Sequence, residues 1–271
     1  MIAVNEEHRR PFYAEYAWAF DLLIDRPVRK ECAAIAGWLI ERGVPPGAAL
    51  LDAGCGTGRY STELGRRGYV VHGIDSSPEL VAVAKRSISE GQGSVSFAIG
   101  NILTMPADRY DAILCRGVLN DILDDAERDA IFERFAEALQ PCGVLILDVR
   151  EWDASAERKA REPVFRKRVS TDRGELTFTS ITELDPEHRQ LVISERHALV
   201  DEGRERISDY RFVMRCWTTN ELRSTLARCR FGNVAYFGAY DATVEPGVTD
   251  RLVTVAQRAR ALARVDPSVL L

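Results

Sequence analysis

The segment that most constrains the fold is a glycine-rich stretch between residues 48 and 60. An apolar run at 48–53 predicts a buried strand; glycines at 54, 56 and 58 follow it, and then a helix begins. Glycine lets the backbone adopt positive φ and approach a ligand closely, because no Cβ is in the way. A strand, a glycine loop and a helix in this order form the first half of a nucleotide-binding α/β unit.

The spacing of the glycines separates two families of such units. A dinucleotide fingerprint requires glycine at the first, third and sixth loop positions, and the sixth position here is Arg59. The stretch instead resembles motif I of class I S-adenosylmethionine (SAM)-dependent methyltransferases. The residues that carry this resemblance, and that it implies for cofactor binding, are Asp52, Gly54, Cys55, Gly56 and Gly58. The loop backbone would embrace the methionine part of SAM, while Asp52 orders the loop or reaches the ligand's amino group through water.

Apolar strands alternate with helix signals through the first 150 residues. The predicted strands are 48–53, 69–75, 95–100, 110–115 and 144–149, the last after a breaker at 139–143. Alternation of this kind argues for a parallel sheet covered on both faces. With further strands near 233–239 and 251–257, the resemblance implies a Rossmann-like α/β fold with a mostly parallel seven-stranded sheet.

The pattern changes after residue 160. Segments 175–184, 189–200 and 204–217 are rich in Thr, Val and Ile and lack helical periodicity, which predicts three antiparallel strands inserted into the core. The predicted units are an N-terminal helical lid at 1–45, a SAM-binding core at 46–160, an antiparallel β cap at 161–217, completion of the core sheet at 218–260, and a tail at 261–271.

Polar residues at the ends of the second and third strands extend the cofactor prediction. Asp75 ends the second strand, where a carboxylate can accept hydrogen bonds from both ribose hydroxyls, and Ser76 follows it. Asn101 and Ile102 follow the third strand. The resemblance implies that Asn101 accepts from the adenine amino group, where related enzymes often carry Asp, while the next backbone N–H meets a ring nitrogen.

The aromatic stretch at 12–20 resembles the amino-terminal lid of small-molecule methyltransferases. In such lids an aromatic hydroxyl touches the SAM carboxylate, and Tyr13 is the residue we assign to that contact. Trp18 and Phe20 are interpreted as core. Arg26, Arg29 and Lys30 could neutralise the SAM carboxylate, but surface charge is the preferred interpretation.

The segment from Cys115 to Asp121 corresponds to motif IV and should face the methyl group. Arg116 is assigned to cofactor binding. Asn120 and Asp121 are the catalytic candidates, for orienting the acceptor or taking its proton; the alternative is that they cap the helix beginning near residue 124. His197, on an inserted strand, is interpreted as structural rather than as a base.

The amino-acid composition limits the kinds of partner that the chain is expected to bind. Thirty-six basic and 41 acidic residues give a net charge of −5, which argues against nucleic acid as a partner. The six cysteines are scattered without metal-ligand spacing, so we expect no metal site and a reducing, cytoplasmic location. No apolar run has membrane-spanning length.

These patterns predict methyl transfer from SAM to an N or O atom of a small metabolite, mainly by proximity and orientation. The cap would wall the acceptor pocket and serve as a homodimer contact. Three alternatives remain open: a methyltransferase acting on RNA or protein, a nicotinamide-dependent dehydrogenase, and a non-catalytic SAM-fold module. A basic groove beside the site would favour the first alternative, and binding of NADH would favour the second. Failure to bind SAM would favour the third.

Overall fold

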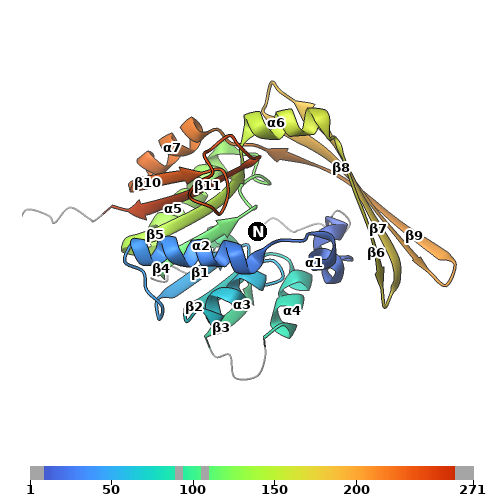
Figure 1. Ribbon diagram of the computed structural model, residues 1–271, viewed down its shortest axis with the longest axis horizontal. Helices are drawn as coiled ribbons and strands as arrows, with labels where there is room; N and C mark the ends of the chain where they lie inside the picture. The colour runs from blue at the N-terminus through green and yellow to red at the C-terminus, as the bar shows by residue number, and fades with distance from the viewer. Residues whose placement is uncertain (1–8, 89–93, 105–109, 260–271) are drawn as a thin grey trace, which may run out of the picture.

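The computed structural model describes residues 9–88, 94–104 and 110–259, so the predicted tail at 261–271 lies outside the described residues. The strands of its main sheet are β1 (Ala49–Ala53), β2 (Val70–Asp75), β3 (Val95–Ile99), β4 (Tyr110–Arg116), β5 (Leu139–Arg150), β10 (Phe231–Phe237) and β11 (Arg251–Arg258). Their order is β10-β11-β5-β4-β1-β2-β3 (Figure 1).

Strands β1 to β5 run parallel to one another, and β11 runs antiparallel to both β5 and β10. The expected Rossmann-like α/β fold with a mostly parallel seven-stranded sheet is therefore confirmed. In such a sheet, ligands bind outside the carboxyl ends of the strands, where the order reverses between β1 and β4.

Helices cover both faces of this sheet. One face carries α2 (Val28–Glu41), α3 (Arg59–Arg66) and α4 (Pro78–Arg86), and the other carries α5 (Asp125–Ala138) and α7 (Thr219–Arg228). Polar caps fix where three of them start: Ser77, Asp124 and Thr218 accept hydrogen bonds from backbone N–H groups three residues on. Helix α2 packs its apolar side on the sheet.

Strand β5 is longer than the sequence indicates. The expected breaker at 139–143 is wrong, because β5 begins at Leu139 and pairs there with Tyr110 of β4. The pairing register shifts between Tyr110 and Ala112, and Cys142 adopts a positive φ of 66°. A bulge of this kind admits Pro and Gly into a strand that would otherwise exclude them.

The insertion forms a separate antiparallel sheet, which we call the cap sheet. Its strands are β6 (Val164–Thr171), β7 (Gly174–Asp185), β8 (Gln190–Asp201) and β9 (Arg204–Arg215), preceded by α6 (Trp152–Arg161). Four strands replace the three expected, because β6 is an edge strand with no buried side chain and so carries no apolar signature. The cap sheet extends away from the main sheet as a long, narrow arm (Figure 1).

Residues 9–24, here called the strap, connect the two sheets. The strap contains two 3₁₀ turns (Pro11–Tyr13 and Ala17–Ala19) and the short helix α1 (Phe20–Leu23). It lies between the main sheet and the cap sheet in Figure 1. Phe12 and Tyr16 are buried against Phe178 and Leu199 of the cap sheet, so the strap shares a hydrophobic core with it. No described helix has the length and apolar character needed to cross a membrane.

Candidate active site

A cavity of about 400 Å³ opens at the carboxyl ends of β1, β2, β3 and β4. The sequence-predicted residues that line it are Tyr13, Gly54, Cys55, Gly56, Asp75, Ser76, Asn101, Ile102, Arg116 and Asp121. They come from separate segments spread over more than a hundred residues. The parallel sheet brings them together because each follows the end of a strand or lies in the strap above those ends.

The glycine loop builds the floor of the cavity. Gly54 N and Cys55 N donate to the carbonyl of Ile74 at 2.8 and 2.9 Å, which ties the loop to β2. The φ angle of Gly56 is +55°, and a Cβ built there would meet no atom within 4 Å. Because Gly56 also lines the cavity, a side chain at this position would occupy the space of a ligand.

Two motif I residues lie behind the cavity rather than in its lining. Gly58 has a φ of +75°, and a Cβ there would come within 2.4 Å of Phe97 Cζ, so this glycine serves packing. Asp52 is buried and accepts a hydrogen bond from the Ser61 hydroxyl on α3. Burial raises the pKa of Asp52 to about 6. Both residues fix the loop between β1 and α3.

Asp75 closes the loop from the β2 side. Its two carboxylate oxygens accept from Gly56 N at 2.8 Å and from Ser77 N at 2.9 Å. Each oxygen keeps a second lone pair, and Asp75 lines the cavity beside Ser76. The carboxylate is thus held rigidly with acceptor capacity left for a pair of neighbouring hydroxyls.

Asn101 differs in detail from the expectation. Its side-chain oxygen accepts from Leu103 N at 2.8 Å, so only the second lone pair of that oxygen remains for a ligand. The neighbouring wall of the cavity is apolar, formed by Ile74, Leu80, Ile102, Val118, Ile122 and Ile131. Such a wall suits a flat, weakly polar ring rather than a charged group.

Arg116 joins a buried charge cluster at the opposite end of the cavity. Its guanidinium donates to Tyr240 Oη at 2.6 Å and to Glu31 Oε2 at 3.1 Å, and lies 3.3 Å from the centre of the Tyr60 ring. Asp148 pairs with Arg251 at 2.7 Å.

Arg26, interpreted from sequence as surface charge, lines the cavity and lies 4.0 Å from Asp148. With Arg116 and Arg251, three guanidinium groups face the two carboxylates of Glu31 and Asp148. One positive charge is left over, which suits an anionic group on a ligand.

The strap forms the roof. Asp21 Oδ1 accepts from Thr57 Oγ1 and pairs with Arg59 Nε, each at 2.8 Å. Ser77 Oγ donates to the carbonyl of Tyr13 at 2.6 Å. Phe20, expected to be core, lines the cavity as well. The cavity is therefore enclosed by a segment anchored directly on the glycine loop and on the residue after Ser76.

Asp121 and Tyr13 supply the polar groups of the wall below the strap. Both line the cavity, and Asp121 Oδ1 is buried without a hydrogen-bond partner among the described residues. Burial raises the pKa of Asp121 to about 6, although Arg10 lowers it. A carboxylate of that pKa is ionised at neutral pH, and one of its oxygens is left without a hydrogen-bond partner among the described groups.

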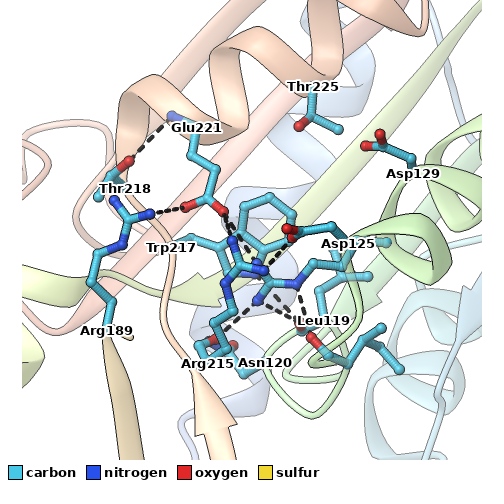
Figure 2. A network of polar contacts seen from close by, with 12 residues as sticks. Leu119, Asn120, Asp125, Asp129, Arg189, Arg215, Trp217, Thr218, Glu221 and Thr225 are labelled. Atoms are coloured by element: carbon cyan, nitrogen blue, oxygen red, sulfur yellow. Dashed lines mark hydrogen bonds and ion pairs between the residues drawn. The ribbon is translucent and has the colours of Figure 1, made fainter. Parts of the chain in front are cut away.

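Asn120 does not lie in the cavity. Its side chain donates to the Arg215 carbonyl at 2.9 Å and accepts from Arg150 N at 3.0 Å. The side chain of Arg215 meets Glu221 on α7, which Arg189 also approaches (Figure 2). Asn120 thus fastens the end of β4 to β5 and to the cap sheet, and the structure gives its amide no access to a ligand.

His197 is fully buried in the core shared by the strap and the cap sheet. Its ring stacks on Tyr16 with centroids 4.5 Å apart, and neither ring nitrogen has a hydrogen-bond partner among the described residues. Burial lowers the pKa of His197 to about 4, so the ring is neutral. This placement agrees with the structural interpretation.

Sequence reasoning missed the partners that hold the strap. Arg10 pairs with Glu195 of β8, and Asp21 pairs with the loop. No local pattern signals contacts between residues 185 positions apart. Arg59 carried a usable signal, because a basic side chain just after the glycine loop faces whatever covers that loop.

Comparison with known proteins shows which proteins this chain is similar to. Residues 50–143 match the family model of a methyltransferase domain. The fold matches a SAM-dependent methyltransferase from Clostridium acetobutylicum with a TM-score of 0.75 at 16% identity, covering 90% of this chain and 98% of that one. DesVI of Streptomyces venezuelae gives a TM-score of 0.73 at 18% identity, again covering 90% of this chain and 98% of that one. The resemblance to class I methyltransferases is thereby confirmed.

Among curated relatives, the ubiquinone biosynthesis O-methyltransferase of Xanthomonas campestris is 35% identical over 105 residues, 38% of this chain and 43% of that protein. The dTDP-3-amino-3,6-dideoxy-α-D-glucopyranose N,N-dimethyltransferase of Streptomyces fradiae is 29% identical over 145 residues, 51% and 54%. The chain spans about half the length of these relatives. CalS10 of Micromonospora echinaspora, an amino pentose methyltransferase of the same fold (TM-score 0.68, 21% identity, covering 93% and 100%), was solved with SAM bound.

Proposed function

We propose that this chain is a SAM-dependent methyltransferase that methylates an N or O atom of a small molecule. One observation carries the proposal. A single enclosed cavity joins a glycine loop and a ribose-type carboxylate, Asp75, to an ionisable group with a free oxygen, Asp121. The matched methyltransferase domain and the SAM-bound structure of CalS10 support SAM as the ligand of this loop.

The residues present fit that cofactor group by group. Gly56 leaves room at the loop, Asp75 keeps lone pairs for two hydroxyls, and the apolar wall near Ile102 suits a base. The net positive cluster around Arg26 and Arg116 suits the methionine carboxylate. Tyr13 also lines the cavity, so the expected contact between its hydroxyl and that carboxylate stays a prediction.

When bound, SAM would supply a methyl group activated by its sulfonium: the acceptor lone pair would form the new bond to the methyl carbon, and S-adenosylhomocysteine would leave with the electrons of the broken carbon–sulfur bond. The chain contributes mainly by holding the acceptor in line, a source of about 7–11 kcal/mol in well-oriented reactions. Asp121 takes the proton that the acceptor atom releases and passes it to water.

A small-molecule acceptor is favoured by the closed strap and by the relatives named above, whose names specify a ubiquinone precursor pathway and an amino sugar. The homodimer expected from the sequence stays a prediction, and sedimentation velocity at micromolar concentration tests it.

Calorimetric titration with SAM and S-adenosylhomocysteine tests the proposal directly. We expect both to bind to the wild-type chain, and Asp75→Ala to lose the binding while staying folded by circular dichroism. A screen of small amines and phenols with SAM, read by mass spectrometry for a gain of one methyl group, then identifies the acceptor class. Absent SAM binding, or saturable binding of NADH, would contradict the proposal.

A further inference from the structure

A buried ion pair links the strap to the cap sheet behind the cavity wall. Arg10 Nε and Nη2 donate to the two carboxylate oxygens of Glu195 on β8, at 2.9 and 2.5 Å. Only 11% of the Arg10 side chain and 3% of the Glu195 side chain are exposed. Such a pair contributes little net stability, because desolvation offsets the attraction. Net stability alone therefore gives little reason for the ion pair, although the Arg10 Cζ atom also packs 3.9 Å from the centre of the Phe212 ring.

The third partner of this pair is Tyr13. Arg10 Nη1 donates to Tyr13 Oη at 2.7 Å, and the Arg10 Cζ atom lies 4.5 Å from the centre of the Tyr13 ring. A guanidinium has only donors, so the Tyr13 oxygen acts as acceptor and its own proton is left to donate elsewhere. Because Ser77 holds the Tyr13 carbonyl, the residue is fixed at both ends.

Asp121 lines the same cavity as Tyr13 and is a titratable neighbour of this ordered hydroxyl. Burial raises the pKa of Asp121, whereas Arg10 and Tyr13 lower it. Asp121 Oδ1 nevertheless lacks a hydrogen-bond partner among the described side chains and backbone. One oxygen of the carboxylate is thus left for a ligand that carries an N–H or O–H group.

We propose that Arg10 and Glu195 are positioning residues that hold the Tyr13 hydroxyl against Asp121 and so leave the free Asp121 oxygen to the methyl acceptor. The inference rests on the proposed function, since it assigns Asp121 to the acceptor half of the same cavity. Arg10 and Glu195 themselves do not line the cavity, so they act through Tyr13 and Asp121.

Charged residues on three elements act on Asp121, and replacing them should shift the Asp121 pKa in opposite directions. Arg10 of the strap and Arg150 at the end of β5 lower its pKa, whereas Glu195 of β8 raises it; Tyr13 is the hydrogen-bonding neighbour. Arg10→Met should therefore raise the pKa of Asp121 by about 1, as expected for loss of a nearby opposite charge. Glu195→Gln should lower it, because Gln removes the negative charge and still offers Arg10 an acceptor.

The experiment is a carbon-13 NMR titration of aspartate carboxyl groups in the full chain, with and without S-adenosylhomocysteine. The Asp121 signal is identified by its loss in Asp121→Asn. A purely structural pair would destabilise the fold in both variants without opposite shifts in the Asp121 pKa. Opposite shifts support the positioning role, and shifts in one direction, or no shift in either, overturn it.

Two further variants serve as controls for this titration. Arg196→Met changes the next residue of β8, whose exposed side chain pairs with Asp209 at 2.7 Å, and should leave the Asp121 pKa unchanged. The double variant Arg10→Met/Glu195→Leu removes both charges if a single one fails to fold. It should still raise the pKa, since Arg10 acts on Asp121 more strongly than Glu195 does. No shift in the double variant would overturn the inference.

Repeating the titration in a Tyr13→Phe protein tests whether Tyr13 transmits the effect of Arg10 to Asp121. If Tyr13 carries part of the coupling, Arg10→Met must shift the Asp121 pKa less in this background than in the wild type. An equal shift would remove Tyr13 from the proposal. Calorimetry with S-adenosylhomocysteine distinguishes failure of the proposed function from failure of this inference. If the wild type does not bind the ligand, the proposed function is wrong. The NMR titration without ligand still tests whether Arg10 and Glu195 act on Asp121.

Discussion

Asp21 accepts a hydrogen bond from the hydroxyl of Thr57 at 2.8 Å, and this contact joins the strap to the glycine loop. Arg59 Nε pairs with the same carboxylate oxygen at 2.8 Å, so one side chain holds two loop residues. Because strap residues such as Phe20 line the cavity, we expect this contact to slow the release of a ligand bound there. This contact between Asp21 and the glycine loop lies at the cofactor half of the site rather than at the acceptor half.

Asp21→Ala should speed dissociation of S-adenosylhomocysteine about tenfold, since a hydrogen bond to a charged group contributes roughly 1.5 kcal/mol. Stopped-flow displacement measures the rate. Asp25→Ala, at an exposed aspartate four residues further on, is the matched control and should leave the rate unchanged. Equal rates for the Asp21 variant and the wild type would show that the strap does not gate the cavity.

The two loop glycines Gly56 and Gly58 should fail in different ways when each is changed to alanine. A methyl group on Gly58 meets Phe97 Cζ at 2.4 Å, so Gly58→Ala should lower the free energy of unfolding by about 1–3 kcal/mol. A methyl group on Gly56 meets no protein atom, so Gly56→Ala bears only the cost of its positive φ, about 1 kcal/mol. Its main loss should be in SAM affinity.

Thermal melting and calorimetric titration on both glycine variants separate these effects. If Gly56→Ala binds SAM as tightly as the wild type, the loop is not the cofactor cradle, whatever its conformation.

Asp121→Asn should lower turnover about 10²- to 10⁴-fold, the usual contribution of a positioned base, while SAM affinity stays the same. The pKa of Asp121 is about 6, and a base works in its ionised form. Wild-type activity should therefore rise as pH increases through 6, and the Asn variant should lose this rise. The acceptor found by the methylation screen serves as substrate; a matching pH profile in both proteins would remove Asp121 from the mechanism.

The parts of the fold that sequence predicted are those whose signals are local. Strands such as β1 and β4 are buried on both faces, so their apolar runs are continuous, and helices such as α5 begin at a capping side chain that a reader can see. Strand β6 carries no such signal, because it lies at the edge of the cap sheet and has no fully buried side chain. Its hydrogen bonds to β7 define it instead.

The same distinction between local signals and long-range contacts holds for the residues of the candidate site. Asp75, Ser76 and the loop glycines follow strand ends, and strand ends in a parallel sheet converge, so their positions in the chain sufficed. The strap contacts depend on how residues 9–24 settle against a sheet formed 170 residues later. Asn120 illustrates the limit: its place after β4 predicts a ligand contact, yet its amide is used by the backbone of Arg150 and Arg215.

The acid sensitivity of the fold should depend on His197. Its pKa is about 4 in the folded chain, because burial among Tyr16, Phe12 and Phe178 disfavours the charged ring, and about 6.5 once unfolded. The unfolded chain thus binds the extra proton first, so this group's contribution to stability is lost as pH falls from 6.5 towards 4. Linkage gives about 2 kcal/mol between pH 7 and pH 5.

His197→Phe removes this titration and keeps a ring in the stack. The free energy of unfolding from urea denaturation, measured for variant and wild type at pH 7 and pH 5, should differ by about 2 kcal/mol more at the lower pH. His188→Gln is the opposing control: Asp185 raises the pKa of His188, so losing that histidine should weaken the fold more at low pH. A His197→Phe difference independent of pH would mean that the buried ring does not titrate between the two states.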